Sequence, residues 1–271
     1  MDKGLHFITG LPRSGSTLLS ALLKQNPKFQ AGVTTPMALL FGNLQTAMSG
    51  RNEFHSFIDN DTRRRVLSSM FSAYYTGIHE DKVVFDTNRS WSSRIPALLE
   101  IFPAAKFIFC VRAVGDIVNS LENITQKNSL EPSRIFNYAA SGTIYDRVND
   151  LIKPTGMVGH AYNGLKQAFY GKFTENIVLL PYKSLASDPR KSLQGIYDFI
   201  GEQYFEHDFD NVSFNSDAYD KHLGLPGLHS VRPQVTLAES KLIVPPDLLA
   251  RFSGSEFWNV EEANTRSVRV L

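Results

Sequence analysis

One glycine-punctuated turn near the start of the chain constrains the fold more than any other stretch. Residues 5–10 form a short apolar run whose length and β-branched or aromatic content are typical of a buried strand. A helical pattern begins near Ser16, with leucines on one face at Leu18, Leu19, Leu22 and Leu23. Backbone N–H groups in a turn of this kind, together with a helix N-terminus, bind anions. The sequence therefore predicts a strand, a phosphate-binding loop and a helix.

The turn differs from the common nucleotide loop at one position. Its spacing Gly10-x4-Gly15 matches the opening of the P-loop, but Ser16 stands where that motif has lysine. The basic residue is instead Arg13, inside the loop. In P-loop enzymes the lysine contacts the β- and γ-phosphates, so its absence disfavours a magnesium-dependent kinase. Taken alone, the loop is also consistent with a plain polar turn that binds nothing.

A second strand and helix lie further along the chain. Residues 106–111 form a continuous apolar run, which is typical of a parallel strand buried on both faces. Arg112 follows directly, and Ser120 lies about two turns into the helix predicted from Ala113. Ligands of open α/β sheets bind beyond the carboxyl ends of the strands. We therefore expect Arg112 and the Arg13 loop to face one crevice.

Together the two motifs resemble the sulfotransferases that use 3′-phosphoadenylyl sulfate (PAPS). Pro12-Arg-Ser-Gly-Ser-Thr-Leu-Leu19 looks like their 5′-phosphosulfate loop, in the arginine-bearing form of the tyrosylprotein enzymes and their bacterial relatives. Arg112 with Ser120 looks like their 3′-phosphate site. Residues 177–189 are similar, more weakly, to the stretch that places a tyrosine near the adenine, here Tyr182. The resemblance covers about residues 5–201 and implies an α/β, P-loop-like three-layer fold with a central parallel sheet flanked by helices.

This resemblance implies a reaction and a set of binding residues. A sulfuryl group would pass from PAPS to an acceptor hydroxyl or amine, releasing adenosine 3′,5′-bisphosphate, without a metal. A C-terminal loop with basic residues closes over the nucleotide in this family, and residues 221–233 are the corresponding segment here. The nucleotide-binding residues implied in this way are Arg13, Ser14, Gly15, Ser16, Thr17, Arg112, Ser120, Tyr182, Ser230 and Arg232. Arg13 would also take up charge on the leaving oxygen.

The catalytic base is the least defined part of the site. Cytosolic members of the family carry a catalytic histidine at the end of the strand that corresponds to residues 82–85. Here that position offers Asp86 as a candidate base and Arg89 as a candidate cation for the sulfuryl oxygens. An equally good interpretation is that Asp86 caps the following turn and pairs with Arg89. We assign structural roles to the two histidines of the C-terminal loop, His222 and His229.

One departure separates this chain from the tyrosylprotein enzymes. In those proteins, the segment corresponding to residues 29–37 is irregular and carries the glutamate that acts as base, whereas here it holds no carboxylate. This difference puts sulfation of tyrosine in doubt. The acceptor is expected to be a small molecule or a peptide, which the sequence does not name.

Composition limits the partners and the organisation of the chain. With 28 basic and 27 acidic residues the formal net charge is +1, which favours neither nucleic acid nor a membrane surface as a partner. We expect one domain over residues 1–271, located in the cytoplasm because no apolar span or leader is found, and the sequence leaves a homodimer open. Residues 257–271 are polar, and we expect them to fray.

Two other functions remain open at this point. The first is a P-loop phosphotransferase that uses ATP and Mg²⁺ and has no preference for a 3′-phosphate. The second is a catalytically silent member of the family that binds a nucleotide or a protein partner.

Overall fold

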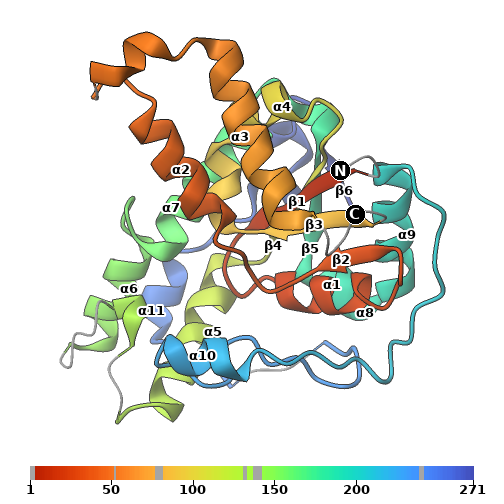
Figure 1. The fold of residues 1–271 in the computed structure, drawn as a ribbon. Helices are drawn as coiled ribbons and strands as arrows, with labels where there is room; N and C mark the ends of the chain where they lie inside the picture. The colour runs from red at the N-terminus through yellow and green to blue at the C-terminus, as the bar shows by residue number, and fades with distance from the viewer. Residues whose placement is uncertain (1–3, 52, 77–81, 131–132, 137–141, 238–240) are drawn as a thin grey trace.

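A six-stranded parallel sheet forms the centre of the molecule (Figure 1). The computed structural model describes residues 4–51, 53–76, 82–130, 133–136, 142–237 and 241–271. The strand order is β2-β3-β1-β4-β5-β6. The strands are β1 (Leu5–Gly10), β2 (Phe29–Ala31), β3 (Val83–Thr87), β4 (Phe107–Val111), β5 (Ile177–Pro181) and β6 (Arg269–Val270).

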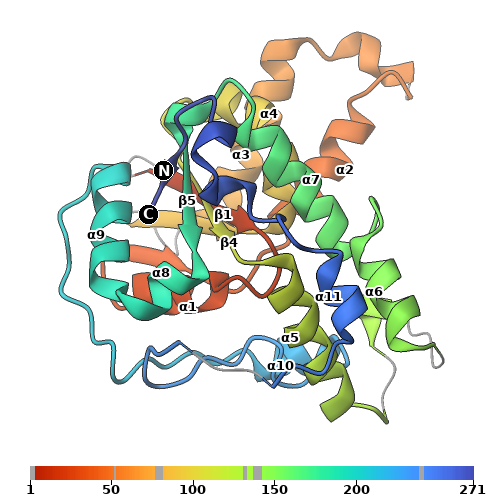
Figure 2. The same ribbon diagram turned by 180° about the vertical axis from the view of Figure 1, so that it is seen from behind.

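Helices cover both faces of the sheet (Figures 1 and 2). One face packs against α1 (Ser16–Leu23), α8 (Tyr182–Ser187) and α9 (Pro189–Ile200). The opposite face packs against α2 (Met37–Ala47), α3 (Asn60–Tyr75), α4 (Ile95–Ile101), α5 (Val114–Lys127), α6 (Ile144–Ile152), α7 (Met157–Phe169) and α11 (Pro246–Ala250). Alternate residues of one strand supply the two cores, as Phe7 and Ile8 of β1 show. The predicted α/β fold with a flanked parallel sheet is confirmed.

The central strands bring three loops to one edge. β1 lies between β3 and β4 and runs parallel to both, so the segments after these strands leave the sheet side by side. The backbones approach closely where Gly10 pairs with Cys110, because a Cβ atom on Gly10 would lie 2.2 Å from the Cys110 carbonyl oxygen. Gly10 also has a φ of +111°, which side chains rarely tolerate. This glycine therefore sets the start of the predicted phosphate-binding loop.

Three strand boundaries differ from the sequence predictions. β3 continues through Asp86 and Thr87, so Asp86 lies within the strand instead of beyond its end. β2 lies in the segment that we expected to be irregular and pairs with β3. The C-terminal residues do not fray, because β6 pairs with β5 and the Ser184 hydroxyl donates to the Leu271 carbonyl at 3.0 Å. No helix in the described part of the chain is long and apolar enough to cross a membrane.

Candidate functional site

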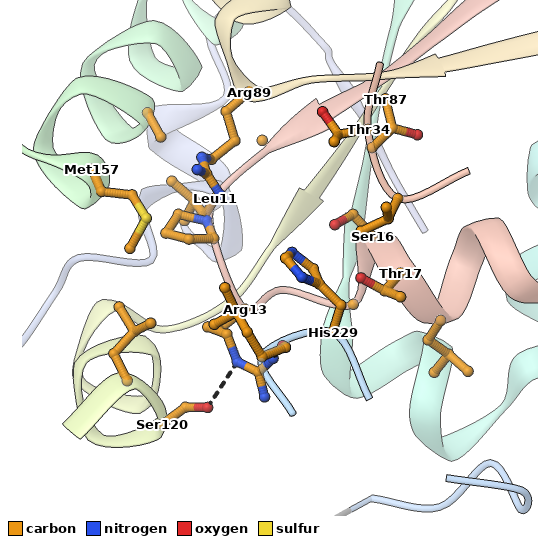
Figure 3. A pocket seen from close by; sticks show the side chains of 18 of the residues that line it. Leu11, Arg13, Ser16, Thr17, Thr34, Thr87, Arg89, Ser120, Met157 and His229 are labelled. Carbon is orange, nitrogen blue, oxygen red and sulfur yellow. Dashed lines mark hydrogen bonds between the residues drawn. The ribbon is translucent and has the colours of Figure 1, made fainter. Parts of the chain in front are cut away.

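A large pocket opens at the carboxyl edge of the sheet (Figure 3). Its volume is about 1450 Å³. The walls include the loop after β1, the segment after β3, one face of α5, the start of α7 and C-terminal residues between 219 and 236. These stretches carry most of the residues that the sequence singled out. The two predicted nucleotide motifs therefore face one cavity, as expected from the topology.

The glycine-rich loop presents only part of its predicted residues to this pocket. Arg13 and Gly15 both have positive φ, at 57° and 90°, which turns the backbone sharply before α1 begins at Ser16. Ser16 and Thr17 line the pocket at the N-terminus of α1. Ser14 is buried instead, and its hydroxyl donates to the Pro12 carbonyl at 3.2 Å. The hydroxyls available to an anion in this loop are those of Ser16 and Thr17.

Arg13 crosses the pocket and joins three segments of the chain. Its Nε donates to the hydroxyl of Ser120 on α5 at 3.1 Å, and its guanidinium also donates to the Leu228 carbonyl. Burial lowers the pKa of Arg13, and the neighbouring charge of Arg112 lowers it further. Two cations held together in a desolvated place favour an anionic ligand, which would relieve their repulsion.

Arg112 stands beside Arg13 at the end of β4. One of its guanidinium N–H groups donates to the Arg13 carbonyl at 3.3 Å, and the guanidinium carbon lies 4.6 Å from the centre of the Tyr182 ring. Its Nε is 3.6 Å from a carboxylate oxygen of Asp116, which is within ion-pair range but beyond hydrogen-bond range. Among the described residues this buried Nε has no hydrogen-bond partner. Unpartnered buried donors are uncommon in folded proteins, and each points to strain, a functional role or an ion.

The contact between Arg13 and Ser120 changes one expectation. The family resemblance places Arg13 at the phosphosulfate end of the nucleotide and Ser120 at the 3′-phosphate end. In the structure the two side chains are hydrogen bonded to each other. Figure 3 shows the Arg13 side chain directed toward Ser120 and away from Ser16 and Thr17. To serve the two ends of one nucleotide, Arg13 has to release Ser120.

Asp86 does not lie where a base would be needed. Its carboxyl group has no exposed surface and accepts hydrogen bonds from Thr35 Oγ1 at 2.7 Å, Tyr75 Oη at 2.6 Å and Trp91 Nε1 at 2.9 Å. Burial raises the pKa of Asp86, and the three hydrogen bonds oppose this shift. We had expected this carboxylate at the open end of β3, whereas the strand carries it into the core. Its contacts connect α3 to the sheet and do not include Arg89.

Arg89 follows β3 and extends into the pocket (Figure 3). Its backbone carbonyl is fixed by the hydroxyls of Thr9 and Ser92, at 3.1 and 2.9 Å. Within the described part of the chain the guanidinium has no hydrogen-bond or ion-pair partner. The close protein surroundings lower the pKa of Arg89, although the side chain remains open to the solvent of the cavity. This cation is available to bind anionic oxygens.

The C-terminal segment closes one side of the pocket. Ser230 and Arg232 line it, as predicted, and they follow α10 (Asp217–His222). His229 lines it as well, although we expect only a structural role for it from the sequence. Its ring nitrogen Nδ1 lies 2.5 Å from a carboxylate oxygen of Asp220. Nine residues separate the two in the chain, and only the turn around Gly224 and Gly227 brings them together.

The charges of the pocket are of one sign. None of the described residues that line it is Asp or Glu. The lining cations are Arg13, Arg89, Arg112, Lys127, Arg232 and Lys241. The whole chain has a net charge of only +1, so this positive charge is local. A cavity of this kind concentrates field lines and attracts a polyanion. It offers no carboxylate ligand to Mg²⁺, which most often binds through carboxylates and phosphates.

Comparisons with known proteins identify a family and related folds. Residues 6–206 match the model of the Sulfotransferase family. The sulfotransferase domain from the curacin biosynthetic pathway has a similar fold, with a TM-score of 0.60 at 14% identity over 93% of this chain and 96% of that one. The sulfotransferase domain of the Synechococcus PCC 7002 olefin synthase gives 0.53 at 18% identity, over 93% and 94% of the two chains.

A third solved structure extends the similarity to another source. A sulfotransferase from Alicyclobacillus acidocaldarius has a TM-score of 0.53 at 14% identity, over 93% of this chain and 92% of that one. At such identities the solved structures show a common fold and no more. The family model, however, spans well over half of the chain and includes both arginine motifs, so this protein belongs to the sulfotransferase family.

Proposed function

We propose that this protein is a PAPS-dependent sulfotransferase that modifies a hydroxyl or amine of a small-molecule or peptide acceptor. The observation that carries the proposal is the pair of adjacent arginines, Arg13 and Arg112, in a pocket lined by cations and hydroxyls. Family membership supports the reaction class. The unsatisfied Nε of Arg112 supports an anionic ligand at the second motif.

The residues of the pocket fit the parts of the donor. Arg13, Gly15, Ser16 and Thr17 would hold the 5′-phosphosulfate, and Arg112 with Ser120 would hold the 3′-phosphate. Arginine suits both groups because its planar guanidinium binds phosphate oxygens through two parallel hydrogen bonds. The adenine would lie near Tyr182, and the C-terminal segment would contribute Ser230 and Arg232. When bound, PAPS supplies a sulfuryl group attached to a phosphate leaving group.

The side chains around the transferred group would stabilise charge as it moves. Arg13 would face the oxygen that becomes negative as the leaving group departs, and Arg89 would face the sulfuryl oxygens. Such cations act strongly in a site that excludes water, and they need no reorganisation at the moment of reaction. Arg89 suits this role because it reaches into the pocket without an acid partner in the described part of the chain.

Two measurements test the proposal. Isothermal titration with adenosine 3′,5′-bisphosphate and with ADP, each with and without Mg²⁺, should show metal-independent preference for the bisphosphate. Preference for ADP with Mg²⁺ would instead identify a phosphotransferase. Turnover of labelled PAPS over a panel of phenols, primary alcohols and amines should then give a labelled product. Tight bisphosphate binding without transfer to any acceptor would identify a silent, nucleotide-binding protein.

A further inference from the structure

A histidine and a fully buried aspartate form a pair at the wall of the pocket. Asp220 has no exposed surface, and both of its carboxylate oxygens contact His229. Oδ1 lies 2.5 Å from the ring nitrogen Nδ1, and Oδ2 accepts from the backbone N–H of the same residue at 2.8 Å. Two contacts from one carboxylate fix both the backbone and the ring of His229. The orientation of the imidazole is therefore set before any ligand binds.

This arrangement determines which nitrogen of His229 can accept a proton. An ionised carboxylate only accepts hydrogen bonds, so Nδ1 must carry the hydrogen that lies between the ring and Asp220. In the neutral ring the lone pair then remains on Nε2. His229 lines the cavity, with 18% of its side chain exposed, and Figure 3 shows its ring pointing into the cavity among Arg13, Arg89 and Ser16.

The position of His229 relates it directly to the phosphosulfate loop. Arg13 donates to the carbonyl of Leu228, the residue immediately before His229. The imidazole therefore lies beside the arginine that we assign to the leaving oxygen, on the loop side of the pocket. Asp86, the base expected from the sequence, lies in the core with three donors of its own. His160 on α7 also lines the pocket, but no carboxylate holds it in the described part of the chain.

The charges around His229 keep its ring ready to accept a proton. Burial lowers the pKa of His229, and the positive charges of Arg13 and Arg89 lower it further. The carboxylate of Asp220 acts in the opposite direction. The Tyr219 ring, with its centre 5.6 Å from that of the imidazole, is another titratable neighbour. The lowered pKa of His229 favours the neutral ring, which is the form that can accept a proton.

We propose that His229 is the general base of the reaction and that Asp220 is its positioning residue; this inference rests on the proposed sulfotransferase function. Nε2 takes the proton of the acceptor hydroxyl or amine while the acceptor oxygen or nitrogen forms its bond to sulfur. The bond between sulfur and the bridging oxygen of the 5′-phosphate breaks, and its electron pair stays on adenosine 3′,5′-bisphosphate. The proton then passes from His229 to solvent.

The first test replaces the base while keeping its contact with Asp220. In His229→Asn the side-chain amide can still donate to the carboxylate, but no group replaces Nε2. We expect turnover of labelled PAPS, with the best acceptor of the panel, to fall by about 10²–10⁴-fold, the usual contribution of one general base. Affinity for adenosine 3′,5′-bisphosphate should not change. The matched control His222→Asn, at an exposed position of α10, should retain turnover.

Two results would overturn the assignment of His229 without affecting the proposed function. One is a His229→Asn variant that binds the bisphosphate and turns over within about tenfold of the unaltered protein. Another is a comparable loss in His160→Asn only. By contrast, if the unaltered protein neither binds the bisphosphate nor transfers from PAPS, the proposed function itself fails. The two failures are therefore distinguishable.

Two further measurements separate a positioning role for Asp220 from a merely structural one. Asp220→Asn removes the negative charge that raises the pKa of His229, so the acid limb of the pH–turnover profile should move to lower pH while the plateau falls. A reduced plateau with an unmoved limb would contradict the role. Nitrogen NMR of histidine-labelled protein with the bisphosphate bound needs no acceptor. It should show Nδ1 protonated and Nε2 unprotonated, and the reverse tautomer would overturn the proposal.

Discussion

Two buried aspartates differ in their contacts and therefore in the roles that we expect for them. Asp86 and Asp220 both have no exposed surface. The Asp86 carboxylate accepts hydrogen bonds from two hydroxyls and one indole N–H, which come from three segments of the chain. The Asp220 carboxylate contacts a single histidine of the pocket with both of its oxygens. We therefore expect the first to act on stability and the second on catalysis.

Replacement of Asp86 tests this distinction. Asp86→Ala removes the carboxylate to which Tyr75 and Thr35 donate, and it leaves the Trp91 indole N–H without its acceptor in the core. We expect the free energy of unfolding to fall by about 2–4 kcal/mol, because each stranded buried donor costs roughly 1–3 kcal/mol. Urea denaturation measures the loss, and Asp61→Ala, at an exposed ion pair, provides the control. Turnover per folded molecule should persist, and its abolition would return Asp86 to the catalytic machinery.

Replacement of Arg112 tests the 3′-phosphate site. Arg112→Ala should strongly weaken binding of adenosine 3′,5′-bisphosphate and leave 5′-AMP binding nearly unchanged, because only the first ligand carries the group that this arginine would hold. Isothermal titration compares the two ligands. Arg190→Ala, which removes a surface ion pair with Glu206, should affect neither. Equal losses for both ligands would remove Arg112 from the proposed 3′-phosphate site.

At the scale of elements, the accuracy of prediction follows the length of the apolar pattern. β1 agrees with its prediction, and β4 begins one residue later, because continuous apolar runs leave a clear signal. β2 and β6, of three and two residues, are too short to show periodicity, and pairing with longer neighbours defines them. Prediction of the site residues depended in the same way on how clear the sequence pattern was. The two motif loops were predictable, but the pairing of Asp220 with His229 depends on a turn whose geometry the sequence does not reveal.

The junction between β1 and the phosphate-binding loop gives a prediction at this scale. In Gly10→Ala the new methyl group would lie 2.2 Å from the Cys110 carbonyl oxygen, at a φ of +111°. We expect the free energy of unfolding to fall by about 2–4 kcal/mol from strain and overpacking, with weaker bisphosphate binding. Gly32→Ala is the control, because a Cβ atom there meets nothing within 4 Å. Equal stability of the two variants in urea would contradict the close approach of β1 and β4.

The whole molecule should lose stability in mild acid because of two buried histidines. Burial lowers the pKa of His6 and of His207 to about 4, and His6 Nδ1 accepts a hydrogen bond from the Lys106 backbone at 3.1 Å. In the unfolded chain both rings titrate near 6.5. Between these values the unfolded state binds more protons than the folded state. Their contribution to stability is therefore complete above pH 6.5 and is lost as the pH falls toward 4.

Denaturation at two pH values measures this dependence. The urea midpoint should be lower at about pH 5 than at about pH 7. His6→Gln keeps a side-chain acceptor but cannot be protonated, so the drop between the two pH values should be smaller in this variant. His222→Gln changes an exposed histidine and should keep the full drop. An identical pH dependence in His6→Gln and the unaltered protein would exclude His6 as a source of acid lability.

The hydrogen-bond partners of Arg13 affect how easily this side chain can bind an anionic ligand. Its guanidinium donates to a hydroxyl and a peptide carbonyl, both uncharged, and forms no ion pair with a described residue. The guanidinium is charged but both of its partners are neutral, and a hydrogen bond between two ionised groups adds the attraction of opposite charges. A phosphate bound here would therefore replace two neutral acceptors with an anionic one, and would displace no salt bridge between Arg13 and a described residue. Arg13 is thus an already desolvated cation whose two hydrogen-bond partners are both neutral.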